Sequence, residues 1–205
     1  MAEKLLTAIA VNCTLKRGQA ASSTDRLLAE VINELSGHGV TTATIRAANE
    51  NILPGVTSNE GKDDAWPAIR QRILAADILV VGTPIWLGQP SSVCKRVLER
   101  MDAFLSETDD QGRMVSYGRV ALVVVVGNED GAHHVSAELY QALNDCGFSL
   151  AANAVTYWVG EAMGSVDYKD RPGTPRNVAK ATAEAVSNAV HLAGLLKRSA
   201  YPGQG

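Results

Sequence analysis

The sequence has few of the residues that stabilise small secreted proteins or bind nucleic acids. Three cysteines, Cys13, Cys94 and Cys146, lie far apart in 205 residues, without CxxC or zinc-ligand spacing. This scattered, odd number excludes a disulfide framework and favours a reducing, cytoplasmic compartment. The formal net charge is −3 and the pI about 5.8. The chain therefore lacks the dense basic surface that nucleic-acid binding needs.

Long apolar runs and several common catalytic motifs are also missing. No window approaches roughly 18 consecutive apolar residues, which excludes a transmembrane helix, and the N-terminal apolar run lacks the cleavage site of a signal peptide. The chain contains no GxxxxGK[ST] phosphate loop, no GxGxxG and no GxSxG. We therefore expect neither a membrane-inserted protein nor a P-loop nucleotidase nor a serine hydrolase with a nucleophile elbow.

Strand-like and helix-like patterns alternate along the whole chain. Hydrophobic residues make up 46% of the sequence, which is enough for a packed core. Such alternation is typical of βαβ units, in which helices cover both faces of a parallel sheet. Apolar runs predict strands at residues 4–11, 40–46, 78–82, 120–126 and 151–159. We predict a doubly wound α/β fold with a five-stranded parallel sheet in the order 2-1-3-4-5.

The same patterns predict how the chain is divided and where two strands lie. One domain over residues 1–198 and a flexible tail at 199–205 are expected. The second strand is polar and rich in Thr, so it is expected at a sheet edge, and the uniformly apolar fourth strand in the sheet centre. Three strand-to-helix loops, at residues 12–24, 83–89 and 127–134, should converge on one ligand at the carboxyl ends of the strands.

The first loop, NCTLKRGQAASST, has the composition of a phosphate site. Hydroxyl groups and the charge of Lys16 precede a helix N-terminus, which favours anions. The alternative is that Ser22, Ser23 or Thr24 only caps the helix and the basic side chains are solvated. The candidate phosphate ligands in this loop are Thr14, Lys16, Ser22, Ser23 and Thr24.

The second and third loops have features of a site for a flat ring. In the second, Trp86 offers an aromatic face and Gln89 a donor and an acceptor; an oligomer interface is the alternative role for Trp86. In the third, glycines mark places where a backbone approaches closely. His133 and His134 are adjacent on a helix and have no accompanying ligand set, so we expect no metal site. The candidate residues in these loops are Pro84, Ile85, Trp86, Leu87, Gly88, Gln89, Gly127, Asn128 and Gly131.

The segment TPIWLGQPSSVCKRVLER at residues 83–100, followed by GNEDGAHH at 127–134, resembles the NADPH-dependent FMN reductase family of flavodoxin-like flavoproteins. The resemblance spans nearly the whole chain. It implies that the first loop holds the FMN phosphate, the second the isoalloxazine ring and ribityl chain, and the third the other flank of the ring. The first loop departs from the family's common G-S-x-R-x-x-S form, which makes Arg17 an alternative to Lys16 as a phosphate ligand.

The resemblance implies an FMN-dependent enzyme in which NADPH or NADH delivers hydride to the flavin. A quinone-like, flavin or other small acceptor would then occupy the same face, with no obligatory catalytic side chain and no metal. A homodimer or homotetramer is expected. Two other classes remain open: a flavodoxin-type carrier of single electrons, which the mild net charge disfavours, and a flavin-free interaction module.

Overall fold

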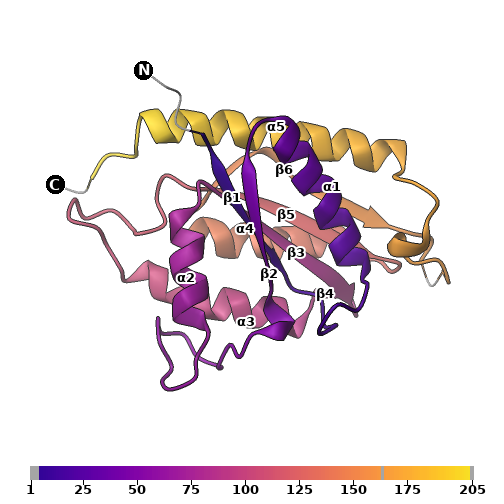
Figure 1. Ribbon diagram of the computed structural model, residues 1–205, viewed down its shortest axis with the longest axis horizontal. Coiled ribbons are helices and arrows are strands. Elements are labelled where there is room, and N and C mark those ends of the chain that lie inside the picture. Colours follow the sequence, from indigo (N-terminus) through magenta and orange to yellow (C-terminus); the bar gives the residue numbers. More distant parts are fainter. Residues whose placement is uncertain (1–4, 163, 204–205) are drawn as a thin grey trace.

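Within residues 5–162 and 164–203, the part of the chain that the computed structural model describes, five parallel strands form a sheet in the order β2-β1-β3-β5-β6 (Figure 1). The strands are β1 (Thr7–Asn12), β2 (Thr41–Arg46), β3 (Ile78–Trp86), β5 (Val120–Gly127) and β6 (Ser149–Val159). In chain order this is the predicted 2-1-3-4-5 arrangement, and the prediction is confirmed. The polar strand β2 lies at an edge, as expected. The apolar β5 is an interior strand, but β3 occupies the centre.

In the described part of the chain, five α-helices and three short 3₁₀ helices cover the two faces of the sheet. The α-helices are α1 (Ser23–Gly37), α2 (Trp66–Ala75), α3 (Ser92–Met101), α4 (Ala132–Asp145) and α5 (Arg176–Arg198), and the 3₁₀ helices are η1 (Ala47–Asn49), η2 (Asp102–Leu105) and η3 (Tyr168–Asp170). Alternate strand residues pack against α1 and α5 on one face and against α2, α3 and α4 on the other (Figure 1). Among these described helices, none has the length and hydropathy needed to cross a membrane.

The segment after the third strand differs from its prediction as a free loop. Strand β3 continues to Trp86 because Pro84 still pairs with β5, and it then turns back into the short antiparallel strand β4 (Gln89–Pro90). The two turn residues, Leu87 and Gly88, have φ values of 52° and 72°. Positive φ at both positions is typical of a type I′ hairpin turn. Helix α3 consequently begins at Ser92, three residues after the predicted end of this loop at residue 89.

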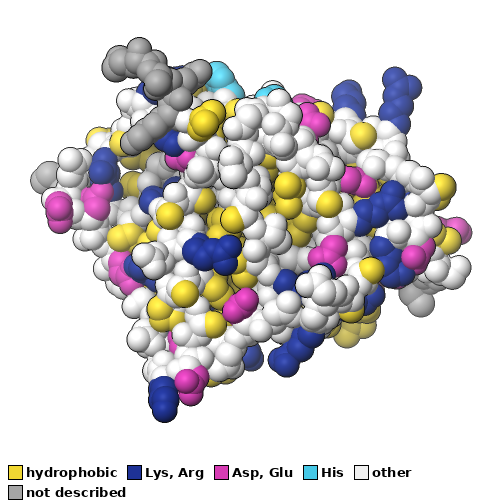
Figure 2. All heavy atoms as spheres, in the orientation of Figure 1, with side chains coloured by type: hydrophobic (Ala, Val, Ile, Leu, Met, Phe, Trp, Pro, Cys, Tyr) yellow, Lys and Arg dark blue, Asp and Glu magenta, His cyan; other side chains and the backbone are white. Residues whose placement is uncertain are grey.

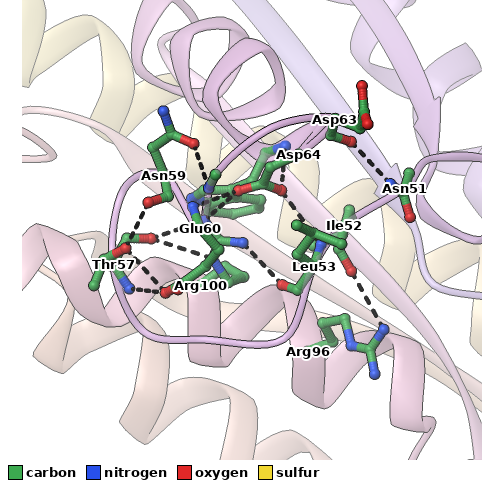
Figure 3. A network of polar contacts seen from close by, with 12 residues as sticks. Asn51, Ile52, Leu53, Thr57, Asn59, Glu60, Asp63, Asp64, Arg96 and Arg100 are labelled. Carbon is green, nitrogen blue, oxygen red and sulfur yellow. Dashed lines mark hydrogen bonds and ion pairs between the residues drawn. The ribbon is translucent and has the colours of Figure 1, made fainter.

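A buried arginine fixes the long loop between β2 and α2. The side chain of Arg100 is 0% exposed and donates to the carbonyl oxygens of Leu53 and Thr57 and to Asp64 Oδ2, the last at 2.8 Å (Figure 3). Its guanidinium also lies over the ring of Trp66. The loop is therefore anchored to α3 by a buried ion pair, even though its residues 50–65 form no helix or strand.

The end of the chain contacts the body of the protein. Tyr201 forms a hydrogen bond with Ser149 and an edge-on ring contact with Tyr117. Residues 204–205 of the predicted flexible tail lie outside the described residues, as do residues 1–4 and 163. Flexibility of the tail stays a prediction.

Candidate functional site

A cleft lies at the carboxyl ends of β1, β3 and β5, and we call it the main cleft. It encloses about 170 Å³. Its lining residues come from four connections of the fold and are Thr14, Leu15, Lys16, Ser22, Ser23, Thr24, Pro84, Trp86, Val126, Gly127, Asn128, Trp158, Asp167 and Tyr168. The three loops that the sequence singled out therefore converge as expected, because parallel strands present their carboxyl ends at one edge.

One part of the lining of the main cleft is polar and comes from the first loop and the start of α1. Ser22 is the N-cap of α1, and its hydroxyl accepts from the backbone N–H of Asp25 at 3.1 Å. Asp25 in turn accepts from the Ser22 backbone, which completes a capping box. Ser22 therefore serves the helix itself. The hydroxyls of Ser23, Thr24 and Thr14 and the N-terminus of α1 are the groups that suit a phosphate.

An arginine from the neighbouring strand fixes the shape of this loop. Arg46 donates to the backbone oxygens of Lys16 and Ala20 and forms an ion pair with Asp25 at 2.6 Å. Lys16 Nζ donates to the carbonyl oxygen of Ala21 at 2.9 Å, so the ammonium group reaches back across the loop. The loop is closed by these bonds, and the Arg46 guanidinium partly neutralises the Asp25 carboxylate.

Another part of the lining of the main cleft is apolar and comes from the β3–β4 hairpin. Pro84 and Trp86 line it, and the Trp86 side chain is 55% exposed. A Cβ atom placed on Gly131 would lie 2.8 Å from the Gly88 Cα, so the third loop packs directly on the hairpin turn. A Cβ atom on Gly127 would lie 3.0 Å from the Ile85 Cβ. Both glycines allow the close backbone approach that the sequence predicts.

A further wall of the main cleft comes from the connection between β6 and α5. Trp158 and Tyr168 pack with ring centroids 5.2 Å apart, and Arg26 of α1 lies over the Tyr168 ring. Burial and a hydrogen bond to the Glu30 carboxylate raise the pKa of Tyr168, so its hydroxyl stays protonated. Asn128 Nδ2 donates to the carbonyl oxygen of Gly164 at 2.9 Å and ties this connection to the third loop.

Sequence reasoning missed this aromatic wall. The predicted site was confined to the loops after the first, third and fourth strands. A usable signal was present: Trp158 stands at the end of a strand, where a parallel sheet binds its ligands.

The predicted site residues divide into two groups in the structure. Nine line the main cleft: Thr14, Lys16, Ser22, Ser23, Thr24, Pro84, Trp86, Gly127 and Asn128. Five lie next to it without lining it: Ile85, Leu87, Gly88, Gln89 and Gly131. Ile85 is buried beneath the hairpin, whereas Leu87 is 91% exposed at its tip. Arg17, the alternative phosphate ligand, faces a different cavity.

His133, His134 and Cys13 have hydrogen-bond partners within the chain. His134 contacts Gln89 at 2.9 Å, and His133 contacts the Tyr157 hydroxyl at 3.0 Å. Cys13 is fully buried, and a hydrogen bond with Cys94 together with burial raises the pKa of its thiol well above the usual value. Such a thiol is a poor nucleophile. Across the described ranges 5–162 and 164–203, His, Cys, Asp and Glu form no cluster of three suited to a metal ion.

Residues 7–163 match the family described as NADPH-dependent FMN reductase. The chain belongs to this family. The resemblance seen in the sequence is thereby confirmed, and membership implies FMN as cofactor, NAD(P)H as reductant and a flavin-associated oxidoreductase as the class of enzyme. An archaeal flavodoxin shares the fold alone, with 8% identity and a TM-score of 0.57. The alignment covers 91% of this chain and 99% of the flavodoxin.

Two relatives are more similar in sequence. The 8-demethyl-8-aminoriboflavin-5′-phosphate synthase of Streptomyces davaonensis is 31% identical over 206 residues, which are 96% of this chain and 80% of the synthase. The divalent metal cation transporter MntH of Mycobacterium bovis is 37% identical over 203 residues. That match takes in 95% of this chain, but the chain spans only 30% of the length of the transporter.

A solved structure is similar to this chain in both sequence and fold. RosB, crystallised with the intermediate 8-demethyl-8-formylriboflavin 5′-phosphate, has a TM-score of 0.87 and 30% identity to this chain. The alignment covers 96% of this chain and 82% of RosB.

The chemistry of the main cleft fits FMN. A phosphate needs hydroxyl and N–H donors at a helix N-terminus, and the polar part of the lining provides Thr14 and, in the first turn of α1, Ser23 and Thr24. A flat ring needs aromatic and apolar walls, and Trp86 and Trp158 both line the cleft.

Proposed function

We propose that this chain is an FMN-dependent oxidoreductase that takes hydride from NADPH or NADH and passes it through FMN to a quinone-like, flavin or other small acceptor. The observation that carries the proposal is the make-up of the main cleft, whose lining combines hydroxyls and a helix N-terminus with aromatic side chains. Family membership supports the flavin and the nicotinamide donor. It does not specify the acceptor.

Bound FMN would supply the hydride chemistry, and the protein would bind and orient it. Thr14, Ser23, Thr24 and Lys16 would hold the phosphate. Trp86 on the hairpin and Trp158 on β6 would flank the ring system and keep water from part of it. The other predicted neighbours, Ile85, Leu87, Gly88, Gln89 and Gly131, would act by placing the hairpin and the third loop rather than by lining the cleft.

Initial-rate kinetics tests the shared use of one face by donor and acceptor. If NAD(P)+ leaves after it has given up its hydride and before the acceptor binds, double-reciprocal plots at several acceptor concentrations run parallel. Intersecting lines would contradict this order. A flavodoxin-type electron carrier is the alternative function, and it predicts a flavin that NAD(P)H does not reduce and that takes electrons from dithionite in two resolved one-electron steps.

A second candidate function is suggested by the relative that makes 8-demethyl-8-aminoriboflavin 5′-phosphate. In this function the same cleft would hold a flavin 5′-phosphate as substrate rather than as resident cofactor. Mass spectrometry of flavin recovered after prolonged incubation with NAD(P)H, oxygen and an amino-group donor distinguishes the two. Recovered FMN of unchanged mass supports the reductase, whereas a changed mass supports flavin modification.

We further propose a homodimer or homotetramer in the cytoplasm. The hairpin tip supports self-association, because Leu87 is 91% and Trp86 55% exposed and aromatic groups are enriched at interfaces. Three free, buried cysteines suit a reducing compartment. Light scattering coupled to size exclusion tests the assembly, and a monomeric mass of about 22 kDa would contradict it.

A further inference from the structure

A second cavity, which we call the side cavity, lies beside the main cleft. It has a volume of about 230 Å³. It is formed by the first loop, the segment after β2 and the start of α3, which meet at the carboxyl edge of the sheet (Figure 1). Its lining residues are Leu15, Arg17, Ala47, Ala48, Glu50, Ile52, Ser92, Val93 and Arg96. Leu15 lines both cavities, so they lie side by side.

The floor of the side cavity is apolar and fixed. Ala47, Ala48 and Ile52 are 3%, 8% and 5% exposed. The first loop is tied to the segment after β2, because Gly18 N donates to Asn49 Oδ1 at 2.7 Å and Arg46 donates to two backbone oxygens of the loop. The cavity is therefore formed before any ligand binds, and its floor suits the face of a purine.

Two guanidinium groups line the side cavity from different elements. Arg17 makes no side-chain hydrogen bond or ion pair with any other residue in the described part of the chain. Arg96 donates one hydrogen bond, from Nη1 to the carbonyl oxygen of Ile52 at 3.3 Å (Figure 3). A guanidinium carries five N–H donors, so most of this capacity is available to a ligand. Glu50 is the single acidic residue in the lining, which leaves one net positive charge.

This concentration of cationic donors is local. Over the face seen in Figure 2, basic and acidic side chains are interspersed, and the whole chain carries a net charge of −3. Arginine pairs strongly with phosphate because its planar fork donates two parallel hydrogen bonds. A dianionic phosphate on a purine nucleoside would satisfy both the guanidinium groups and the apolar floor.

We infer that the side cavity binds the adenosine 2′-phosphate end of NADPH, while its nicotinamide reaches the main cleft past Leu15. Arg17 and Arg96 bind the 2′-phosphate, and Glu50 accepts from a ribose hydroxyl or the adenine amino group. NADH lacks this phosphate, so the two arginines set the preference for NADPH. The inference rests on the proposed function, which requires a nicotinamide donor but does not fix which one.

The test combines kinetics with a binding measurement that needs no turnover. Arg17→Gln and Arg96→Gln are each expected to lower the NADPH-to-NADH ratio of kcat/KM about tenfold, the equivalent of about 1.4 kcal/mol. Glu50→Gln removes the opposing charge and is expected to raise this ratio. Arg72→Gln on α2 makes the same change in net charge at an exposed position away from both cavities and should leave the ratio unchanged.

In parallel, calorimetry measures the binding of 2′-AMP and 5′-AMP to the FMN-loaded protein. The inference predicts tighter binding of 2′-AMP in the wild type and loss of this advantage in Arg17→Gln, which removes no internal contact. Equal binding of the two nucleotides, or an unchanged kinetic ratio in both arginine variants, would overturn it. If the wild type oxidises neither NADPH nor NADH, the proposed function fails, and the binding measurement alone decides whether the cavity recognises the 2′-phosphate.

Discussion

The ion pair between Asp64 and Arg100 is expected to contribute a pH-dependent part of the stability of the fold. Burial of Asp64 opposes its ionisation, but hydrogen bonds from Arg100 and from three backbone N–H groups outweigh this effect and lower the pKa to about 2 from an ordinary 3.8. A pKa lower in the folded state stabilises that state above the unfolded value. This stabilisation is about 2 kcal/mol at neutral pH, because one pKa unit is worth about 1.4 kcal/mol.

The substitution Asp64→Asn measures this contribution of the ion pair to stability. It leaves the Arg100 guanidinium buried without an anionic partner, and breaking a buried pair costs about 3–5 kcal/mol. We expect a loss of about 3 kcal/mol in the free energy of unfolding at pH 7, since the amide oxygen still accepts one hydrogen bond. The difference in unfolding free energy between wild type and variant should shrink by about 1 kcal/mol by pH 3. As the pH falls, the Asp64 carboxylate of the wild type is protonated in the unfolded state before it is protonated in the folded state, and the Asn side chain of the variant does not titrate.

Urea unfolding followed by circular dichroism at intervals from pH 7 to pH 3 measures both quantities. Asp63→Asn is the matched control, because the adjacent Asp63 is exposed and its positive φ of 68° suits Asn equally well. This control should change the free energy of unfolding by less than about 0.5 kcal/mol at each pH. A difference between wild type and Asp64→Asn that stayed constant over the whole pH range would refute the reasoning.

Three further predictions concern the main cleft and its hairpin. Lys16→Met should weaken FMN binding about tenfold by removing one charged donor, and should leave riboflavin binding unchanged because riboflavin has no phosphate. Fluorescence titration with both flavins measures this. Equal losses of affinity for the two flavins would contradict the prediction. Leu87→Asn should raise the free energy of unfolding by about 1 kcal/mol, since Asn tolerates the left-handed conformation better than Leu; urea unfolding that shows a loss would count against a strained turn. Gly131→Ala should destabilise the protein by about 1–3 kcal/mol and weaken FMN binding, because the new Cβ would meet the Gly88 backbone. Normal flavin affinity in this variant would mean that FMN binding does not need the contact between the third loop and the hairpin turn.

The sheet could be predicted because its strands are short apolar runs separated by helices. The alternation predicted the parallel sheet, the flavodoxin-like arrangement of doubly wound sheets supplied the strand order, and the polar composition of 41–46 correctly placed β2 at an edge. The β3–β4 hairpin was not predicted, since its turn is Leu87–Gly88 and lacks the Asn-Gly or Asp-Gly pair that usually signals a two-residue turn.

Residues that act across long sequence separations could not be found in this way. From the sequence alone, Arg100 is expected to be a solvated charge on a helix. Its partner Asp64 lies 36 residues earlier, on an irregular loop. Tyr168 belongs to the main cleft through contacts with Arg26 and Glu30, about 140 residues away. Local patterns carry no information about such pairs. The choice of Ser22 over Ser23 or Thr24 as the cap of α1 depended in the same way on backbone geometry.

The central claim is that the main cleft binds FMN and that NAD(P)H reduces it there. The most direct measurement is the visible spectrum of the purified protein with added FMN, repeated anaerobically after NADPH and, separately, NADH. The account predicts a perturbed flavin spectrum on binding and bleaching to the fully reduced form in a single two-electron step by at least one nucleotide. Bound flavin that neither nucleotide reduces, or a protein that leaves the FMN spectrum unchanged, would contradict it.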